Sequence, residues 1–328
     1  MPPQIATVDD DLNRLLKEKF TSEFRTGYIN VDGVCLPEYY AEFADAIENM
    51  QVYDDDIWVC SFPKTGTTWT QEMVWCIANN LDFEGAKIVL SERFPFLDHS
   101  PLFDYRTIIP RTPGLELLPE LTANSVEHIN KLARPRFIKT HLPFNLLPRQ
   151  IRTAEKQPKI VYVARNAKDT CISYFHHCKL LEGYRGDFLE FCSLFLGGKL
   201  CFGPFWNHVL AYWSERQRDN FLFIKYEDMK HDLRAVIKRV ADFLGKSLAP
   251  CEIDILKRHL SFESMKANPA VNYEEVVELN KKYKLIETDG QFMRSGQLNQ
   301  WKGTMSDDVI AKFDSWTAKN LKSSGLRL

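Results

Sequence analysis

Short runs of apolar residues recur along the chain, at 57–60, 136–141, 159–164 and 221–224. Each run has the length of a strand, and its almost continuous apolar composition is typical of a strand buried on both faces. Helical length and apolar spacing are found instead at 71–78, 203–218 and 229–244, and Gly245 is placed to end the last helix. This alternation predicts a single α/β domain over 1–328, with a central parallel sheet flanked by helices.

Three longer segments lie outside this alternation. Residues 1–50 are mixed in character, with a packed helix expected at 39–44, and we interpret them as an extension packed on the core. Residues 91–134 are rich in proline and aromatic residues, and together with 264–300 they are candidate lid or loop segments, because long loops inside compact domains are commonly functional. Residues 87–90 fit either a strand or the end of a helix.

Composition and charge narrow the class of protein. Hydrophobic residues make up 45% and charged residues 26% of the 328, as in ordinary globular proteins. The net charge of −2 argues against a general nucleic-acid binder but permits a local basic pocket. The N-terminus lacks the basic region and apolar core of a signal peptide. The most apolar later stretch, 188–206, is broken by charged residues, glycines and a proline, so we expect no membrane span.

The cysteines indicate a reducing compartment. None of the eight forms a Cys-x-x-Cys pair, and several lie inside apolar runs, such as Cys60 and Cys76. Cysteines in such positions pack as small hydrophobic residues. We therefore expect a cytoplasmic chain without a disulfide framework or a zinc site.

The stretch 61–69, Ser-Phe-Pro-Lys-Thr-Gly-Thr-Thr-Trp, follows the first predicted strand and precedes a predicted helix. A strand, a tight glycine-containing loop and a helix aim free backbone N–H groups and a helix N-terminus at an anion. Lys64 adds a positive charge, and Gly66 allows the backbone to approach a ligand closely. This stretch predicts a phosphate or sulfate site.

Other polar residues follow the predicted strands at their carboxyl ends, where ligands of parallel sheets bind. Lys139 and His141 end the second strand, and Arg165 follows the third. Asn166 can cap the next helix, with Asp169 in a position typical of a capping box. We expect these side chains and Lys64 to converge on one site.

The loop differs from the nucleotide-binding P-loop, G-x-x-x-x-G-K-[ST], in which the lysine follows the second glycine. If Gly66 is that glycine, Thr67 replaces the lysine, and the positive charge has moved back to Lys64. Magnesium-dependent phosphoryl transfer needs the lysine and the metal ligand together on the phosphates. The loop therefore favours an activity other than that of a kinase or ATPase.

Four blocks together resemble the cytosolic sulfotransferases, over most of the chain from about Gly27 to Phe313. Residues 62–69 are similar to that family's 5′-phosphosulfate loop, and 135–143 to the strand that carries its catalytic histidine. Residues 162–176 are similar to its 3′-phosphate strand and helix, and 292–296 with Trp301 and Lys302 to its C-terminal cofactor segment. The resemblance implies transfer of a sulfuryl group from 3′-phosphoadenosine 5′-phosphosulfate (PAPS) to a hydroxyl or amine.

The resemblance also implies a role for each matching residue. His141 is the expected general base, assisted by the catalytic residues Lys64, Lys139 and Ser173. The cofactor contacts implied are Lys64, Thr65, Gly66, Thr67, Thr68, Trp69, Arg165, Ser173, Trp206, Phe262, Phe292, Met293, Arg294, Ser295 and Gly296. Trp69, Phe262 and Trp206 are the candidates for stacking on adenine. Lysines and amides supply the positive charge, so no metal is expected.

The chain departs from the family pattern at several positions. Ser295 replaces a lysine, Asn299 replaces a glycine, and Trp206 replaces a tyrosine near the adenine. The family's dimerisation motif is also broken in 302–311, so the chain is expected to be a monomer or a homodimer of another kind.

The acceptor is expected to be a small hydrophobic molecule, such as a phenol, alcohol, steroid or retinoid. Phe96, His141 and Phe144 are its expected contacts, with Phe94 and Phe103 as further candidate wall residues. The long segments resemble insect-type family members, which include a retinol dehydratase. Net dehydration through a transient sulfate ester therefore stays open, as do a P-loop-type kinase and a binding protein without turnover.

Overall fold

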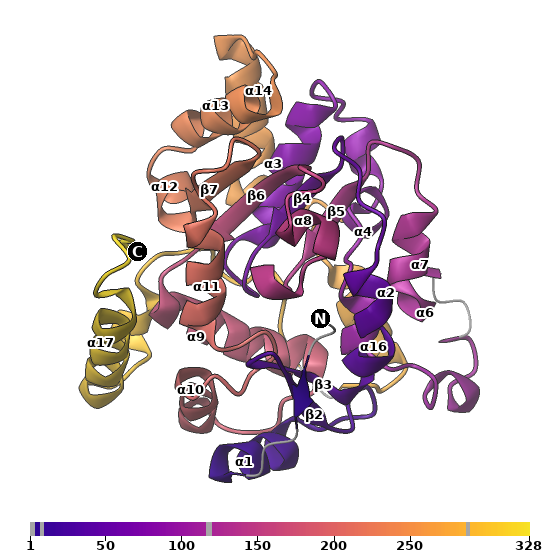
Figure 1. The fold of residues 1–328 in the computed structure, drawn as a ribbon, viewed down its shortest axis with the longest axis vertical. Helices are drawn as coiled ribbons and strands as arrows, with labels where there is room; N and C mark the ends of the chain where they lie inside the picture. Colours follow the sequence, from indigo (N-terminus) through magenta and orange to yellow (C-terminus); the bar gives the residue numbers. More distant parts are fainter. Residues whose placement is uncertain (1–3, 7–9, 116–119, 287–288) are drawn as a thin grey trace.

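A computed structural model describes residues 4–6, 10–115, 120–286 and 289–328 of the chain. Four parallel strands form the central sheet in the order β5-β4-β6-β7, with bounds Phe137–Thr140, Ile57–Cys60, Lys159–Ala164 and Phe221–Lys225. All four predicted strands are confirmed, and their carboxyl ends meet at one edge of the sheet. The predicted α/β fold with a central parallel sheet is therefore confirmed (Figure 1).

Helices cover both faces of this sheet. Alternate strand residues divide between two hydrophobic clusters, so that Trp58 and Tyr162 face one cluster while Val59 and Val161 face the other. This two-sided burial explains why the strands are apolar throughout. On the face of Val59 lie α3, α13 and α14 (Thr67–Ala78, Leu233–Leu244 and Pro250–His259). On the face of Trp58 lie α9, α10, α11 and α17 (Ala167–His177, Phe188–Leu196, Phe205–Ser214 and Asp307–Leu321).

The N-terminal residues pack into the same core as the face of Trp58. An antiparallel sheet contains β1, β2 and β3 (Ile5–Ala6, Tyr28–Val31 and Val34–Pro37), and α1 spans Asp11–Phe20. The helix expected at 39–44 is split into the 3₁₀ turn η1, Glu38–Glu42, and α2, Ala44–Glu48. Val31, Leu36 and Ile47 join the core cluster of Trp58.

The two candidate lid segments contain more helix than their sequence indicated. The first includes α4, α5, η3, α6 and α7 (Leu90–Arg93, His99–Leu102, Ile109–Arg111, Glu120–Ala123 and Ser125–Asn130). The second includes most of α15 (Phe262–Ala267), with α16 and the start of η7 (Glu274–Lys282 and Gln300–Gly303). Parts of the two segments, 116–119 and 287–288, lie outside the described residues. Residues 87–90 form no strand: the turn η2, Gly85–Lys87, ends at Lys87, and α4 begins at Leu90.

Helix ends correct three details of the sequence interpretation. The stretch 229–244 is two helices, α12 (Tyr226–His231) and α13, because the Asp232 side chain caps α13 by accepting from the Ala235 N–H. The stretch 203–218 is helical only over α11, which begins after Pro204. Asn166 caps α9 as expected, but Asp169 forms no capping box and accepts instead from the Asn299 N–H.

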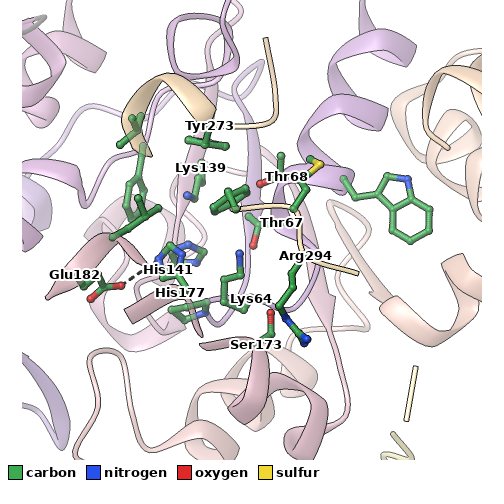
Figure 2. Close-up of a pocket in the computed structure, with 18 of the residues that line it drawn as sticks. Lys64, Thr67, Thr68, Lys139, His141, Ser173, His177, Glu182, Tyr273 and Arg294 are labelled. Carbon is green, nitrogen blue, oxygen red and sulfur yellow. Dashed lines mark ion pairs between the residues drawn. The ribbon is translucent and has the colours of Figure 1, made fainter. Parts of the chain in front are cut away.

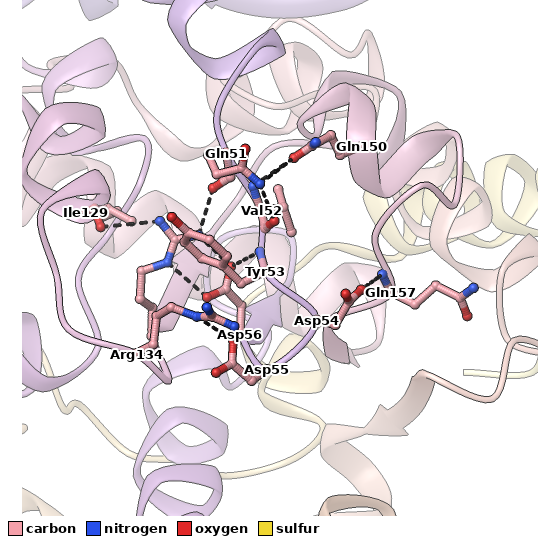
Figure 3. Close-up of polar contacts among 11 residues, drawn as sticks. Gln51, Val52, Tyr53, Asp54, Asp55, Asp56, Ile129, Arg134, Gln150 and Gln157 are labelled. Atoms are coloured by element: carbon pink, nitrogen blue, oxygen red, sulfur yellow. Dashed lines mark hydrogen bonds and ion pairs between the residues drawn. The ribbon is translucent and has the colours of Figure 1, made fainter.

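Strands β4 and β5 are joined at their amino ends by a buried ion pair. Arg136 donates to both carboxylate oxygens of Asp56, over 2.9 and 2.5 Å, and to the carbonyl of Gln51. Figure 3 shows this cluster, with the exposed pair of Arg134 and Asp55 beside it.

None of the helices in the described part of the chain has both the length and the apolar character that a membrane span requires.

The buried pair and the exposed pair should differ in how much the free energy of unfolding falls when the carboxylate is neutralised. Asp56→Asn leaves the Arg136 charge buried without its counterion, so the free energy of unfolding should fall by about 3–5 kcal/mol. Asp55→Asn removes only an exposed pair, which should cost about 0–1 kcal/mol. Urea unfolding measures both values, and equal losses in the two variants would contradict this account of the sheet.

Candidate active site

A cavity of about 290 Å³ opens at the carboxyl edge of the central sheet. Its lining includes the end of the loop after β4, the first turn of α3, the end of β5, α9 and the C-terminal segment 292–296. Figure 2 shows Lys64, Lys139, His141, Ser173 and Arg294 directed toward one space from these separate elements. The structure thus brings together the residues that sequence analysis expected to converge.

The loop after β4 adopts a backbone shape that depends on glycine. Lys64 and Gly66 both have positive φ angles, 67° and 109°. A Cβ atom at Gly66 would lie 2.7 Å from the Tyr226 ring, so a larger residue would be strained by both conformation and contact. The Thr65 hydroxyl donates to carbonyls of Phe62 and Val163, which braces the loop against β6. The Thr65 side chain does not line the cavity, so its backbone N–H is the group it can offer.

Helix α3 begins at the cavity with no side-chain cap. Gly66 is its N-cap residue, and its first turn, Thr67 to Trp69, lines the cavity. The first N–H groups of a helix have no partner within the helix and carry the positive end of the helix dipole. The Thr67 hydroxyl is paired with the Ser61 hydroxyl at 2.7 Å, which fixes the start of the helix. This end of the cavity is therefore built to bind an anion.

A second group of hydrogen-bond donors lies between α9 and the C-terminal segment. Arg165 donates to the carbonyls of Lys64 and Gln297, and its Nε is buried without a hydrogen-bond partner among the described residues. Ser173 and Arg294 line the same region. An arginine with a spare donor beside a hydroxyl and a second guanidinium suits a phosphate group.

The two lysines lie in a low-dielectric environment that disfavours their charge. Burial, together with Lys139 and Arg165, lowers the pKa of Lys64 to about 7, and burial lowers the pKa of Lys139 to about 8. Each ammonium lies over an aromatic ring, Lys64 3.7 Å from the Phe292 centroid and Lys139 3.9 Å from that of Phe96. A bound anion would restore the charge of both lysines.

The hydrogen bonds of His141 define its tautomer. Its Nδ1 lies 2.7 Å from the carbonyl oxygen of Ser61, which can only accept, so Nδ1 carries the proton. Nε2 is then the unprotonated nitrogen. Burial and the neighbouring Lys139 charge hold the pKa of His141 well below its usual range, so the ring is neutral at pH 7. A neutral, oriented imidazole of this kind can accept a proton from a hydroxyl.

Asp98 holds the strand end that carries His141, and sequence analysis missed it. Its carboxylate accepts from the Thr140 hydroxyl at 2.6 Å and from the His141 N–H at 2.5 Å. Burial raises the pKa of Asp98 to about 7. The residues before it run beside β5, where Leu97 N–H donates to the carbonyl of Lys139. An isolated aspartate in an aromatic loop gave no sequence signal for this role.

His177 and Glu182 also line the cavity, although no function was expected of His177. The imidazole pairs with Glu182 at 3.2 Å (Figure 2). Glu182 in turn pairs with the buried Arg25 at 3.0 Å. Arg25 and His177 hold the pKa of Glu182 down at about 2, against the effect of burial. A carboxylate is thus ionised at the wall of the cavity, with a partner from the N-terminal extension.

Most of the expected site residues line the cavity, but Thr65 and three aromatic residues do not. Trp206 is 1% exposed and packs against Phe205 and Trp316 in the core, so it has no access to a ligand. Phe144 packs on Tyr212, and Phe94 packs on Phe137 away from the cavity. The prediction that these three aromatic residues line the cavity is therefore wrong, whereas Phe96, Phe103, Trp69 and Phe262 do line it.

The departures from the family pattern have different consequences. Asn299 has a φ of 59°, a conformation that asparagine tolerates better than most residues, which explains how it can stand where glycine is common. Ser295 lines the cavity but offers a shorter side chain than lysine. Lys302 is exposed and does not line the cavity. Gly296 packs tightly against Phe262, since a Cβ atom at position 296 would lie 2.7 Å from the Phe262 ring.

The fold and the site together define an α/β protein with a strand–loop–helix turn of the anion-binding kind beside a neutral histidine. Residues 54–325 match the family model of the sulfotransferase domain, so the chain belongs to the sulfotransferase family. This result favours a sulfotransferase over the P-loop-type kinase that sequence analysis left open.

Curated relatives and solved structures agree with this assignment. The chain is 43% identical to luciferin sulfotransferase of Photinus pyralis over 321 residues, covering 96% of this chain and 85% of that protein. It is 33% identical to sulfotransferase 1 family member D1 of Rattus norvegicus, covering 93% and 96%. A solved retinol dehydratase, in complex with androsterone and the inactive cofactor PAP, superimposes with a TM-score of 0.90 at 31% identity, covering 100% and 98%.

The residues of this cavity fit an adenosine nucleotide with phosphates at both ends. The free amides of α3 with Lys64 suit one anionic group, and the spare Nε of Arg165 with Ser173 and Arg294 suits another. Trp69 supplies an aromatic surface beside the first group.

The lowered pKa values of the two lysines predict that an anionic nucleotide binds together with protons. At pH 8 the free protein holds Lys64 mostly unprotonated and Lys139 about half protonated. A bound anion raises both pKa values, so binding of adenosine 3′,5′-bisphosphate (PAP) should take up on the order of one proton. Isothermal titration calorimetry in buffers of different ionisation enthalpy measures this number.

The uptake should fade as the pH drops below 7, where both lysines are already charged. Lys64→Met should remove more than half of the uptake at pH 8. The exposed Lys87, which pairs with Glu84 away from the cavity, gives the matched control Lys87→Met with unchanged uptake. A binding enthalpy independent of the buffer at pH 8 would show that the two lysines are charged in the free protein.

Proposed function

We propose that this enzyme transfers the sulfuryl group of PAPS to the hydroxyl or amine of a small, largely apolar acceptor. The observation that carries the proposal is the Nδ1-protonated His141, whose unprotonated Nε2 belongs to the same cavity as Lys64, Lys139 and the start of α3. Bound PAPS would supply the sulfuryl group and a phosphate leaving group. The inactive cofactor PAP bound in the retinol dehydratase structure supports this donor.

The nucleotide side of the proposal rests on the two anion-binding groups. The amides of Thr65 to Thr68 hold the 5′-phosphate, and Lys64 stabilises negative charge as it develops on the leaving oxygen. Arg165 and Ser173 hold the 3′-phosphate, and Arg294 and Gly296 close over it. Trp69 and Phe262 flank the base, with Phe292 and Met293 covering the loop.

On the acceptor side, His141 removes the proton of the attacking hydroxyl at Nε2. The carbonyl of Ser61 keeps the Nδ1 proton in place and stabilises the imidazolium that forms. Lys139 offers its charge to the sulfuryl oxygens, since it lies on β5, the strand that His141 directly follows.

The acceptor's chemical class follows from the walls of the cavity. Phe24, Phe96, Phe103 and Phe202 provide aromatic surface in the cavity, and the Phe96 and Phe202 rings lie 5.1 and 5.6 Å from the His141 ring. Such walls suit a planar or polycyclic molecule. Luciferin sulfotransferase, and retinol dehydratase in its complexes with retinol and androsterone, support acceptors of this size.

A second outcome is supported by the close structural similarity to retinol dehydratase. An allylic alcohol bound along the aromatic walls could lose its new sulfate group, which would give net dehydration. The mass of the product separates the two outcomes, because a stable ester gains a sulfuryl group while an anhydro product loses water.

The proposal is tested by turnover with PAPS, a panel of phenols and alcohols, and detection by mass spectrometry. We expect PAP and a sulfate ester from at least one phenol, without dependence on ATP. His141→Ala should lower turnover by roughly 10²–10⁴-fold, because it removes the general base. Calorimetry should show that PAP binding is retained, since His141 contacts the acceptor side.

His231→Ala is the matched control, since His231 is exposed on α12 and does not line the cavity. It should leave turnover unchanged. Turnover of His141→Ala close to that of the unmodified enzyme would remove His141 as the base. Absence of both PAP and product across the panel would contradict the proposed function itself.

A further inference from the structure

A second imidazole, that of His99, lies in the aromatic wall of the same cavity. It begins α5 and is surrounded by rings: the Phe103 centroid lies 5.3 Å away, and Tyr105 is stacked at 6.2 Å with an interplanar angle of 19°. The Phe96 ring contacts both histidines, at 6.2 Å from His99 and 5.1 Å from His141. His99 therefore lies about one aromatic ring beyond the proposed base.

The His99 side chain has no hydrogen-bond partner among the described residues, in contrast to the other two imidazoles of the cavity. His141 is held by Ser61, and His177 is held by Glu182. Burial and the charge of Lys139 lower the pKa of His99 to about 4, so the ring is neutral at pH 7. A neutral imidazole offers one N–H donor and one acceptor nitrogen.

A polar group in an apolar wall is costly when a ligand displaces its water without replacing the hydrogen bond. An acceptor that is apolar throughout would leave both nitrogens of His99 without partners. A second polar group on the acceptor would satisfy one of them and would fix the molecule along the wall. The arrangement therefore favours acceptors with two functional groups over simple hydrophobic alcohols.

We propose that His99 is a specificity-determining residue that recognises a second, uncharged hydrogen-bonding group of the acceptor, about one aromatic ring away from the hydroxyl that is sulfated. This inference rests on the proposed function, since it places the reacting hydroxyl at His141. A second hydroxyl, a ring nitrogen or a carbonyl has the required chemistry. Tyr105 is stacked on His99 with an interplanar angle of 19°, which restricts rotation of the imidazole.

Acceptors of equal shape test the proposal. 2-Naphthol carries only the reacting hydroxyl, while 2,6-dihydroxynaphthalene and 6-hydroxyquinoline add a hydroxyl or a ring nitrogen on the second ring. For each, kcat/KM for sulfation and the dissociation constant for the protein loaded with PAP are measured. Intrinsic differences in reactivity cancel when the ratio of polar to apolar acceptor is compared between variants.

His99→Phe keeps an aromatic wall but removes both nitrogens. Its ratio of kcat/KM should shift by about 10-fold toward 2-naphthol, and the ratio of dissociation constants should shift in the same direction. His99→Asn keeps a donor and an acceptor and should retain part of the polar preference. His128→Phe is the matched control, because His128 lies on the neighbouring helix α7 and does not line the cavity; its ratios should be unchanged.

Equal ratios in the unmodified enzyme and His99→Phe would overturn the proposal, whichever acceptor is turned over faster. The same conclusion follows if His99→Asn behaves as His99→Phe does in both measurements. Thermal unfolding of each variant shows whether the fold is retained, and the binding ratios of His99→Asn test the proposal if His99→Phe is unstable. Failure to sulfate any acceptor, by contrast, would count against the proposed function.

Discussion

The hydrogen bond between His141 Nδ1 and the Ser61 carbonyl oxygen joins the two halves of the site. Ser61 directly follows β4 and leads into the anion-binding loop, and His141 directly follows the neighbouring strand β5. The parallel register of these strands, with Cys60 opposite Thr140, places the loop and the imidazole at the same edge. One bond of 2.7 Å thus sets the tautomer of the base and its position relative to the loop. A shift of this register would separate the two.

The electrostatics of the cavity follow from the same convergence. Lys64, Lys139 and Arg165 meet in a buried space, and burial with mutual repulsion lowers the pKa of Lys64 to about 7. Glu182 is ionised at the cavity wall, but Arg25 and His177 engage its oxygens. In the free protein Lys64 relieves this repulsion by losing its proton, and a bound anion would restore the charge at a fixed position. Charges held in place in this way stabilise developing negative charge more strongly than solvent would, because the site need not reorient during the reaction.

Sequence alone predicted the parts of this structure that are local or repeated. The apolar strands, the anion-binding loop and the polar residues after each strand follow from short patterns, and the structure brings Lys64, Lys139, His141 and Arg165 to one cavity. Residues whose place depends on packing between distant segments were harder to predict. Trp206 was expected near a ligand, but it fills the core between α11 and α17.

Asp98 and Glu182 are residues of the site that sequence analysis missed for the same reason. Asp98 bonds to Thr140 and Glu182 to Arg25, which lie 42 and 157 positions away in the chain, so no local pattern marked these contacts. The helices in 91–134 were also missed, because their four- to six-residue length is too short for a periodic signal. The roles of the site residues in catalysis stay predictions, which rest on geometry and on the family.

The account is tested most directly by a crystal structure of the enzyme with PAP and 2-naphthol. It predicts the 5′-phosphate against the amides of Thr65 to Thr68, the 3′-phosphate on Arg165 and Ser173, and the naphthol oxygen within about 3 Å of His141 Nε2. A nucleotide bound elsewhere, or a naphthol oxygen turned away from His141 with Nδ1 still on the Ser61 carbonyl, would contradict it.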